Sequence, residues 1–239
     1  MSMSNFARDY HERMFPGYKS DFRRTDPQFI AAFDNFAFDE VIHTKVGSTQ
    51  VSLDDHTRLL SNLAVLLGCQ GIDEYRALLP AALRLGVRGA EVKEMIYQAV
   101  AYLGIGRVFP FLKAANEGLE AQGIPLPVPS EAADEHDRLQ DGVKAQCDIF
   151  GESMRDFYRQ GDADSSHLNY WLTDNCFGDY YTRGTLSLEV REYLTLLFLA
   201  AQGGCEEQLL AHAKANLRLG NSKDFLIALI SANVPFIRH

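Results

Sequence analysis

An acid, a thiol and an imidazole occur close together in the stretch 187–220, and these are residue types that transfer protons or act as nucleophiles. Glu192 belongs to one predicted helix, and Cys205 and His212 follow on the next, beyond the Gly203-Gly204 turn. A helix rises about 1.5 Å per residue, so Glu192 and His212 stand about 16 and 12 Å from the turn. Antiparallel packing would bring the two side chains level. This helical seam is the best candidate site in the sequence.

The second of these helices carries a further polar residue between the thiol and the imidazole. Cys205, Gln208 and His212 follow the spacing i, i+3, i+7, which places them on one face of the helix. Each has an ordinary structural alternative. A lone cysteine is often a small buried hydrophobe, and His212 could be a satisfied core or surface histidine.

Two arginines lie near the acid. Arg191 precedes Glu192 directly, and Arg183 ends the stretch Tyr-Tyr-Thr-Arg at 180–183, which could line the entrance to the seam. The alternative for Glu192 is a simple ion pair with Arg191 or Lys214 on a solvated face.

Apolar residues recur at helical spacing along most of the chain, and no stretch alternates like a strand, so we predict an all-α fold. Glycine and proline mark where the helices end. Residues 45–51 are predicted to form a loop. In the helix over 90–103, we expect Glu91, Lys93 and Glu94 to face solvent. The predicted helices cover residues 5–15, 27–44, 52–68, 73–85, 90–103, 107–122, 130–161 with an interruption at Gly151, 167–182, 187–202, 205–219 and 223–233.

The chain contains an internal repeat. The aligned segments are 36–41 with 175–180, 52–68 with 187–203, and 76–86 with 209–220. We therefore expect two similar helical halves, residues 1–124 and residues 130–239, joined by a proline-rich linker. Each half alone would leave an apolar face open, so the two are expected to pack together.

The two halves differ at the residues of the candidate site. In the alignment of the two halves, Thr57 occupies the position that corresponds to Glu192, and Leu78 occupies the position that corresponds to His212. A buried imidazole beside a carboxylate is costly to keep in a helical core unless hydrogen bonds satisfy both groups. Its presence in one half only indicates that the site is in the second half and is degenerate in the first.

Composition excludes several classes of function. The net charge is −9 over 239 residues and the basic residues are scattered, which disfavours a nucleic-acid partner. The longest apolar run, residues 194–201, is far too short to span a membrane, and no apolar signal core opens the chain, so we expect a cytoplasmic protein. Four widely spaced cysteines without a CxxC pair suit reduced thiols, and the His and Cys spacing predicts no metal site.

Longer motifs resemble a known family. They are FDNFAFDEV and GCQGIDEYRALLPAALRLGV in the first half, and CFGDYYTRGTLSLEVRE and GGCEEQLLAHAKANLRLG in the second. The chain resembles a two-repeat member of the carboxymuconolactone decarboxylase family, within the AhpD-like superfamily. This resemblance implies the AhpD-like helical fold and a homo-oligomer, a trimer or a hexamer.

The resemblance also implies an activity, the decarboxylation of a carboxylated lactone in aromatic catabolism. Such an enzyme, a lyase, needs no cofactor, because the electrons left behind delocalise onto the lactone carbonyl. It must hold an anion, stabilise an oxyanion and deliver a proton. We expect His212 to deliver the proton, Glu192 to orient it, and Arg191 or Arg183 to hold a carboxylate or the oxyanion.

Two alternatives come from other classes. AhpD-type peroxidases carry a glutamate, a CxxC pair and a histidine. Glu192, Cys205 and His212 match that pattern, but Gln208 replaces the second cysteine, so only a one-cysteine peroxidase acting through Cys205 remains as an alternative. In the decarboxylase interpretation, Cys205 and Gln208 are expected to line the substrate site. The second alternative is a non-catalytic binding or assembly module that keeps only the fold.

Overall fold

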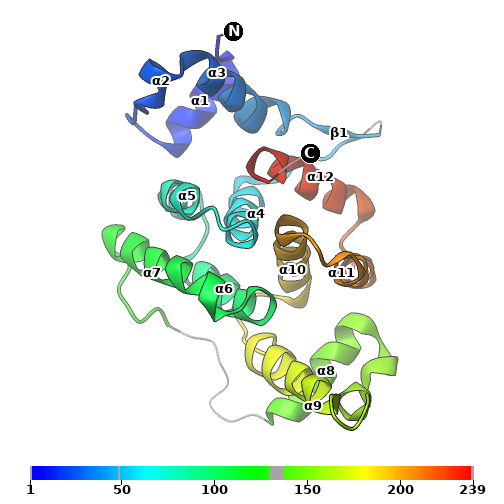
Figure 1. The fold of residues 1–239 in the computed structure, drawn as a ribbon. Helices are drawn as coiled ribbons and strands as arrows, with labels where there is room; N and C mark the ends of the chain where they lie inside the picture. The colour runs from blue at the N-terminus through cyan, green and yellow to red at the C-terminus, as the bar shows by residue number, and fades with distance from the viewer. Residues whose placement is uncertain (1, 48, 130–136, 238–239) are drawn as a thin grey trace.

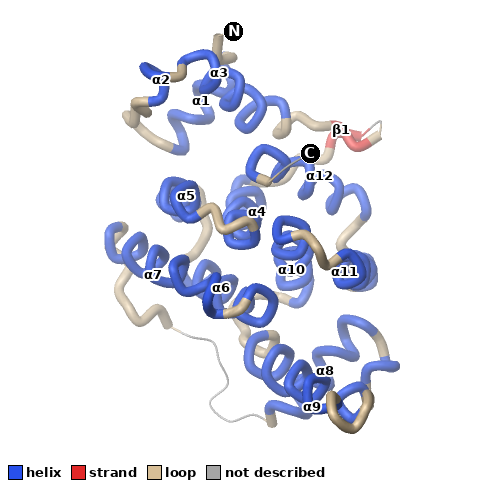
Figure 2. Tube along the Cα trace, viewed as in Figure 1, coloured by secondary structure: helices blue, strands red, loops and turns tan. Residues whose placement is uncertain are grey.

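The computed structural model describes residues 2–47, 49–129 and 137–237, and most of these residues are helical (Figures 1 and 2). This confirms the predicted all-α class. The elements, in chain order, are α1 (Asn5–Met14), α2 (Phe22–Thr25), α3 (Pro27–Asn35), η1 (Phe36–Glu40), β1 (Lys45–Val46), β2 (Thr49–Gln50), α4 (Asp55–Gly68), α5 (Ile72–Arg84), α6 (Gly89–Leu103), α7 (Ile105–Ala121), α8 (Arg138–Phe150), η2 (Glu152–Met154), η3 (Phe157–Arg159), α9 (Ser166–Trp171), η4 (Leu172–Tyr180), α10 (Leu188–Gln202), α11 (Glu206–Arg218), α12 (Lys223–Asn233) and η5 (Val234–Phe236).

Side-chain caps fix the first turns of the helices at the centre of the fold. Asp54 accepts a hydrogen bond from the amide of Thr57 at the start of α4, and Ser187 accepts one from Val190 at the start of α10. These bonds satisfy amides that a helix leaves without a partner. Gly203 ends α10 with φ +71°, a conformation that costs glycine little, so the chain can turn directly into α11.

Helices α4 and α10 form the centre of the molecule and pack against each other (Figure 1). Helix α4 also contacts α5 and α12, and α10 also contacts α6 and α11. Leu63 and Leu67 of α4 and Leu194 and Leu197 of α10 are fully buried in one continuous core. In Figure 1, α1–α3 lie at one end of this core and α8 and α9 at the other.

Three predicted elements differ from the structure. The loop predicted at 45–51 contains a short hairpin, β1 and β2, so the chain is not free of strands. Helix α8 ends at Gly151, as expected, but the chain then continues as the short 3₁₀ turns η2 and η3 rather than as an α-helix to 161. Gly151 has φ +106°, which no α-helix accommodates. The predicted start of this helix, residues 130–136, lies outside the described residues.

The third difference is the presence of π-helix within two predicted α-helices. Residues 36–40 and residues 172–180, which the predicted repeat aligns in part, both wind as π-helix. Such turns are rare and occur often at functional sites. A common origin would explain the shared irregularity, and the division into two repeats stays a prediction.

The contact between α8 and η4 leaves no room for side chains at Gly142. A methyl group there would overlap the carbonyl oxygen of Thr173 and lie 3.0 Å from the amide nitrogen of Gly178. We expect Gly142→Ala to lower the free energy of unfolding by about 1–3 kcal/mol, because backbone on both sides must move. Urea denaturation followed by circular dichroism measures this.

Gly106 provides the matched control for that substitution. It lies in the first turn of α7, and nothing lies within 4 Å of the position that an added methyl group would take. Gly106→Ala should therefore leave stability unchanged or raise it slightly, since alanine is the better helix former. Equal effects of the two substitutions would show that the α8–η4 contact is not tight.

Candidate functional site

The sequence-predicted acid and imidazole meet in the structure. Nδ1 of His212, on α11, lies 2.7 Å from Oε2 of Glu192, on α10. Glu192 is fully buried, and the His212 side chain is 9% exposed. The other ring nitrogen of His212, Nε2, has no hydrogen-bond partner among the described residues. A histidine fixed at Nδ1 by a carboxylate, with Nε2 available, has the arrangement of a proton donor or acceptor.

Aromatic rings enclose this imidazole on two sides. The ring of Tyr102, from α6, lies edge-on at 5.6 Å between centroids, and the ring of Phe150, from α8, lies edge-on at 5.3 Å. Asn216, one turn after His212 on α11, donates to the backbone oxygens of both Glu192 and His212. The imidazole is therefore held in one orientation in an apolar surround.

A chain of hydroxyl groups leads to the other oxygen of Glu192. The Tyr181 hydroxyl donates to Oε1 of Glu192 at 3.0 Å, and Tyr102 lies 2.6 Å from Tyr181, hydroxyl to hydroxyl. The thiol of Cys176, in η4, donates to the Tyr102 hydroxyl at 3.9 Å. Burial raises the pKa of both phenols well above the usual value, so both stay protonated and can keep donating.

Sequence reasoning did not identify Tyr102 or Cys176 as part of the site, and it placed Tyr181 only in a stretch at its entrance. The spacing of Tyr181 from Glu192 along the sequence did not predict their contact. Tyr181 follows the π-helix η4, and a turn then leads into α10, so the two residues do not share one helix. Tyr102 comes from the other half of the chain, so no local pattern could have assigned it.

The two arginines predicted to bind an anion, Arg183 and Arg191, lie side by side and share the carboxylate of Glu94. Arg191 is 0% exposed, and it donates from Nη1 to Oε1 of Gln98 and from Nη2 to Glu94 at 3.2 Å. Nε of Arg183 lies 2.7 Å from Oε1 of Glu94, and the Arg183 side chain is 19% exposed. A ligand could reach Arg191 only after a rearrangement, whereas Arg183 borders the surface.

The expectation that Glu91, Lys93 and Glu94 face solvent is wrong. All three are buried, at 7%, 9% and 3% exposure. Helix α6 packs against α7 on one side and α10 on another, so it has little free surface. Glu94 is stabilised there by the two arginines.

Cys205 and Gln208 do not join His212 through any hydrogen bond within the described chain. The thiol of Cys205, half-buried just before α11, donates to the backbone oxygen of Leu199 at 3.5 Å, and Gln208 is exposed. Burial raises the pKa of the Cys205 thiol, and it raises that of Cys176 to about 12. Both thiols are therefore poor sources of thiolate at neutral pH.

No group of three or more His, Cys, Asp or Glu side chains in the described ranges is arranged to hold a metal ion.

The first half contains a histidine–glutamate pair at a different place. Nε2 of His56, on α4, lies 2.9 Å from Oε2 of Glu91, which also accepts from the backbone amide of Arg88 at 2.9 Å. Burial opposes ionisation of Glu91, but the hydrogen bonds from Arg88 and His56 outweigh it and lower the pKa of Glu91 below the usual 4.5. The His56 side chain is 37% exposed, so this pair is a helix cap near the surface.

The pH dependence of this cap is predictable. A carboxyl group whose pKa is lowered on folding contributes stability that is present above its unfolded pKa and lost as pH falls through its folded pKa. We expect Glu91→Gln to cost about 1 kcal/mol at pH 7, and the difference from the wild type should shrink once the pH falls below 4.5. Urea denaturation at both pH values measures the difference. A cost that did not change with pH would contradict the lowered pKa.

Comparisons with known proteins show which proteins the chain is similar to. Residues 27–117 match the model of the carboxymuconolactone decarboxylase family. No curated protein matches the sequence. A crystal structure from Burkholderia xenovorans LB400, of a "putative gamma-carboxymuconolactone decarboxylase subunit", is similar with a TM-score of 0.57 and 22% sequence identity. The match covers 96% of this chain and 89% of that one.

The fold agrees with that expected from the sequence motifs. None of the helices in the described part of the chain combines the length and apolar character that a membrane span requires. Glu94, Gln98 and Tyr102 lie inside the matched residues 27–117, and they contact the candidate site from α6. The similarity to the carboxymuconolactone decarboxylase family therefore covers residues 27–117, and the chain shares the all-α fold of that solved structure.

Proposed function

We propose that the protein is a carboxymuconolactone decarboxylase-like enzyme that removes carbon dioxide from a small carboxylated lactone without a cofactor, and that its active site is the pair His212 and Glu192. The observation that carries the proposal is the buried pair itself. One imidazole nitrogen is fixed at 2.7 Å from a fully buried carboxylate, and the other is left for a substrate.

The chemistry needs a proton donor rather than a nucleophile. The bond between the ring carbon and its carboxylate breaks, carbon dioxide leaves, and the electron pair moves through the ring double bond onto the lactone carbonyl oxygen. Protonated His212 then gives its Nε2 proton to carbon, and water restores the proton afterwards. Glu192 stabilises the positive charge on the ring in the protonated state and fixes its orientation.

The hydroxyl chain supports this role for Glu192. Tyr181 donates to the oxygen that His212 does not use, so both carboxylate oxygens have a donor. A buried carboxylate with both oxygens satisfied is held in one position at low cost. We propose that Tyr102 and Tyr181 act as positioning residues for it.

Arg183 and Arg191 have different roles in this proposal. We propose that Arg183, at the edge of the site, attracts the substrate carboxylate or the developing oxyanion. Arg191 lies 5.9 Å from the ring of Tyr181, measured from Cζ to the centroid, and it acts from within by holding α6 against α10. We propose that Cys205 and Gln208, at the N-terminal end of α11, border the substrate.

The peroxidase alternative has less support. Burial raises the pKa of Cys205, and no second cysteine stands beside it. Thiol peroxidases depend on a thiolate at neutral pH. Titration of the thiols during a peroxide challenge separates the two functions, because a peroxidase must consume peroxide through Cys205.

The direct test is turnover. Purified protein is incubated with γ-carboxymuconolactone and related carboxylated lactones, and released carbon dioxide and loss of the carboxylated substrate are measured together. Equimolar release of carbon dioxide and loss of substrate, absent in His212→Asn, support the proposal. Loss of substrate without carbon dioxide, or no turnover of any carboxylated lactone by the wild type, would refute it.

We also infer a homo-oligomer, a trimer or a hexamer, in keeping with the description of the solved structure as a subunit. Light scattering of the purified protein tests this, and a monomer at working concentration would contradict it.

A further inference from the structure

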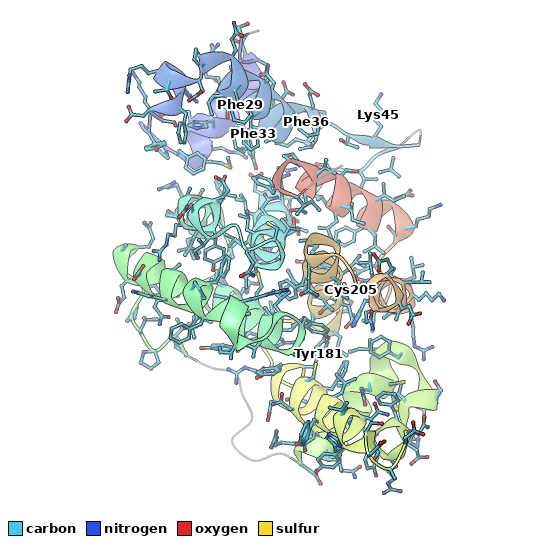
Figure 3. All side chains as sticks on the ribbon, viewed as in Figure 1. Phe29, Phe33, Phe36, Lys45, Tyr181 and Cys205 are labelled. Atoms are coloured by element: carbon cyan, nitrogen blue, oxygen red, sulfur yellow. The ribbon has the colours of Figure 1, made fainter. Side chains whose placement is uncertain are left out.

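A hollow whose lining does not include His212 lies beside the N-terminal helices. It is a cavity of about 530 Å³ between the N-terminal helices and α5, within the range of about 300–1,000 Å³ found for small-molecule sites. None of the residues that line it belongs to the candidate active site. Figure 3 labels Phe33 on α3 near this hollow, whereas Tyr181 is labelled at the far side of the central helices.

The walls of the hollow are mainly apolar. Four phenylalanines line it, and three of them contact other aromatic rings of the wall: Phe33 lies 6.2 Å from Phe38 edge-on, and Phe15 lies 5.0 Å from the ring of His11. Ile30 adds to this part of the wall. Such a surface accepts a flat apolar group and excludes water from the polar groups beside it.

Arg23 and Asp34, which line the hollow, have atoms without a hydrogen-bond partner. Nε and Nη2 of Arg23 are buried without a hydrogen bond to any described residue, and so is Oδ2 of Asp34. Nη2 and Oδ2 are 3.6 Å apart, an ion pair that is too long for a hydrogen bond. The Asp34 side chain is 7% exposed and the Arg23 side chain 35%. Buried donors and acceptors without partners are rare in folded proteins, because each costs free energy, so this arrangement indicates groups that a ligand satisfies.

The unpartnered atoms define the chemistry of that ligand. Nε and Nη2 form one edge of the guanidinium group, and this edge matches the two oxygens of a carboxylate. Oδ2 of Asp34, next to that edge, accepts a hydrogen bond from a donor on the atom beside the carboxylate. A hydroxyl group at position 2 of the acid supplies such a donor, and the apolar walls fit an aromatic side chain.

Two carboxyl groups face the hollow and would repel an anion if both were charged. Burial raises the pKa of Asp34, with Arg23 acting in the opposite direction, and burial raises the pKa of Glu74. Each therefore neutralises more readily than an exposed acid. His11 adds no charge of its own, because burial and the nearby Arg23 lower its pKa.

We propose that the hollow between α1, α2, α3 and α5 is a binding site for a small 2-hydroxy carboxylic acid with an aromatic side chain, held by the Nε and Nη2 edge of Arg23 and by Asp34. The site is separate from the proposed decarboxylation at His212 and does not depend on it.

The test measures binding of 3-phenyllactate to the full-length protein by isothermal titration calorimetry. The dissociation constant should rise about 10- to 100-fold in Arg23→Gln, because two charge-assisted hydrogen bonds are lost. Arg24→Gln is the matched control, since Arg24 is the next residue of α2 and is exposed. It should bind like the wild type, and so should His212→Asn. 3-Phenylpropionate, which lacks the hydroxyl group, should bind the wild type more weakly.

A second variant guards against a folding defect in Arg23→Gln. Ala77 lies on the exposed face of α5 and lines the hollow, so Ala77→Trp should fill the space while the protein stays folded. Loss of 3-phenyllactate binding in Ala77→Trp, with an unchanged circular dichroism spectrum, supports the site. The proposal is overturned if the wild type does not bind 3-phenyllactate at millimolar concentration, if Arg23→Gln and Arg24→Gln behave alike, or if Ala77→Trp binds normally.

Discussion

Replacing His212 by Asn is expected to lower the turnover of a carboxylated lactone by about 100- to 10,000-fold, the usual contribution of a positioned acid or base. Asparagine can still bond to Glu192, but it has no group that exchanges a proton near neutral pH. The effect should fall on kcat, because the proton moves only after the substrate is bound. Steady-state kinetics on the folded variant measure both constants.

Controls for this substitution are available in the same chain. His167 is exposed and lies against Trp171 in α9, so His167→Asn should leave turnover unchanged. Glu192→Gln should give an intermediate loss, because the hydrogen bond to Nδ1 can persist while the charge that stabilises the protonated ring is gone. Full activity in His212→Asn would exclude His212 as the proton donor.

Glu94→Gln is expected to lower the free energy of unfolding by about 3–5 kcal/mol, the cost of breaking a buried ion pair from one side. Glu94 is 3% exposed and faces both Arg183 and Arg191, and Arg191 is fully buried. Neutralising the acid leaves two cations close together without their counter-charge. Urea denaturation at pH 7 gives the free energy from the transition midpoint and slope.

Two further variants separate the ion pair from a general effect of the substitution. Glu120 is exposed on α7, and Glu120→Gln should change stability by less than about 0.5 kcal/mol. The double variant Glu94→Gln with Arg191→Met should lose less than the sum of the two single variants, because it removes a buried charge from each side. Additive losses would show that Glu94 and Arg191 are not coupled.

The contact between α6 and α10 connects Glu94 to the proposed site as well as to stability. Glu94, Gln98 and Tyr102 are spaced four residues apart, so they share the face of α6 that meets α10. Gln98 donates to both the backbone oxygen of Arg191 and the hydroxyl of Thr195, and Tyr102 reaches Tyr181. This face links the residues that match the family to the proposed active site in the other half.

The helical spacing of apolar residues in the sequence was enough to predict much of the fold. It predicted the helices that carry Glu192 and His212, and their heights above the Gly203-Gly204 turn predicted that the two could meet. Such a prediction succeeds because both residues lie on adjacent helices joined by a short turn, where the rise per residue fixes the distance. The apolar pattern likewise predicted the all-α class.

Only the tertiary structure decided which groups surround that pair. Periodicity places a polar residue on the surface by default, so Glu94 was expected in solvent, and its burial depends on arginines 89 and 97 residues further along the chain. Tyr102 joins the site from the other half for the same reason. The cost of burying a charge or a hydroxyl group is set by its partners in space, and the spacing of residues along one helix does not contain them.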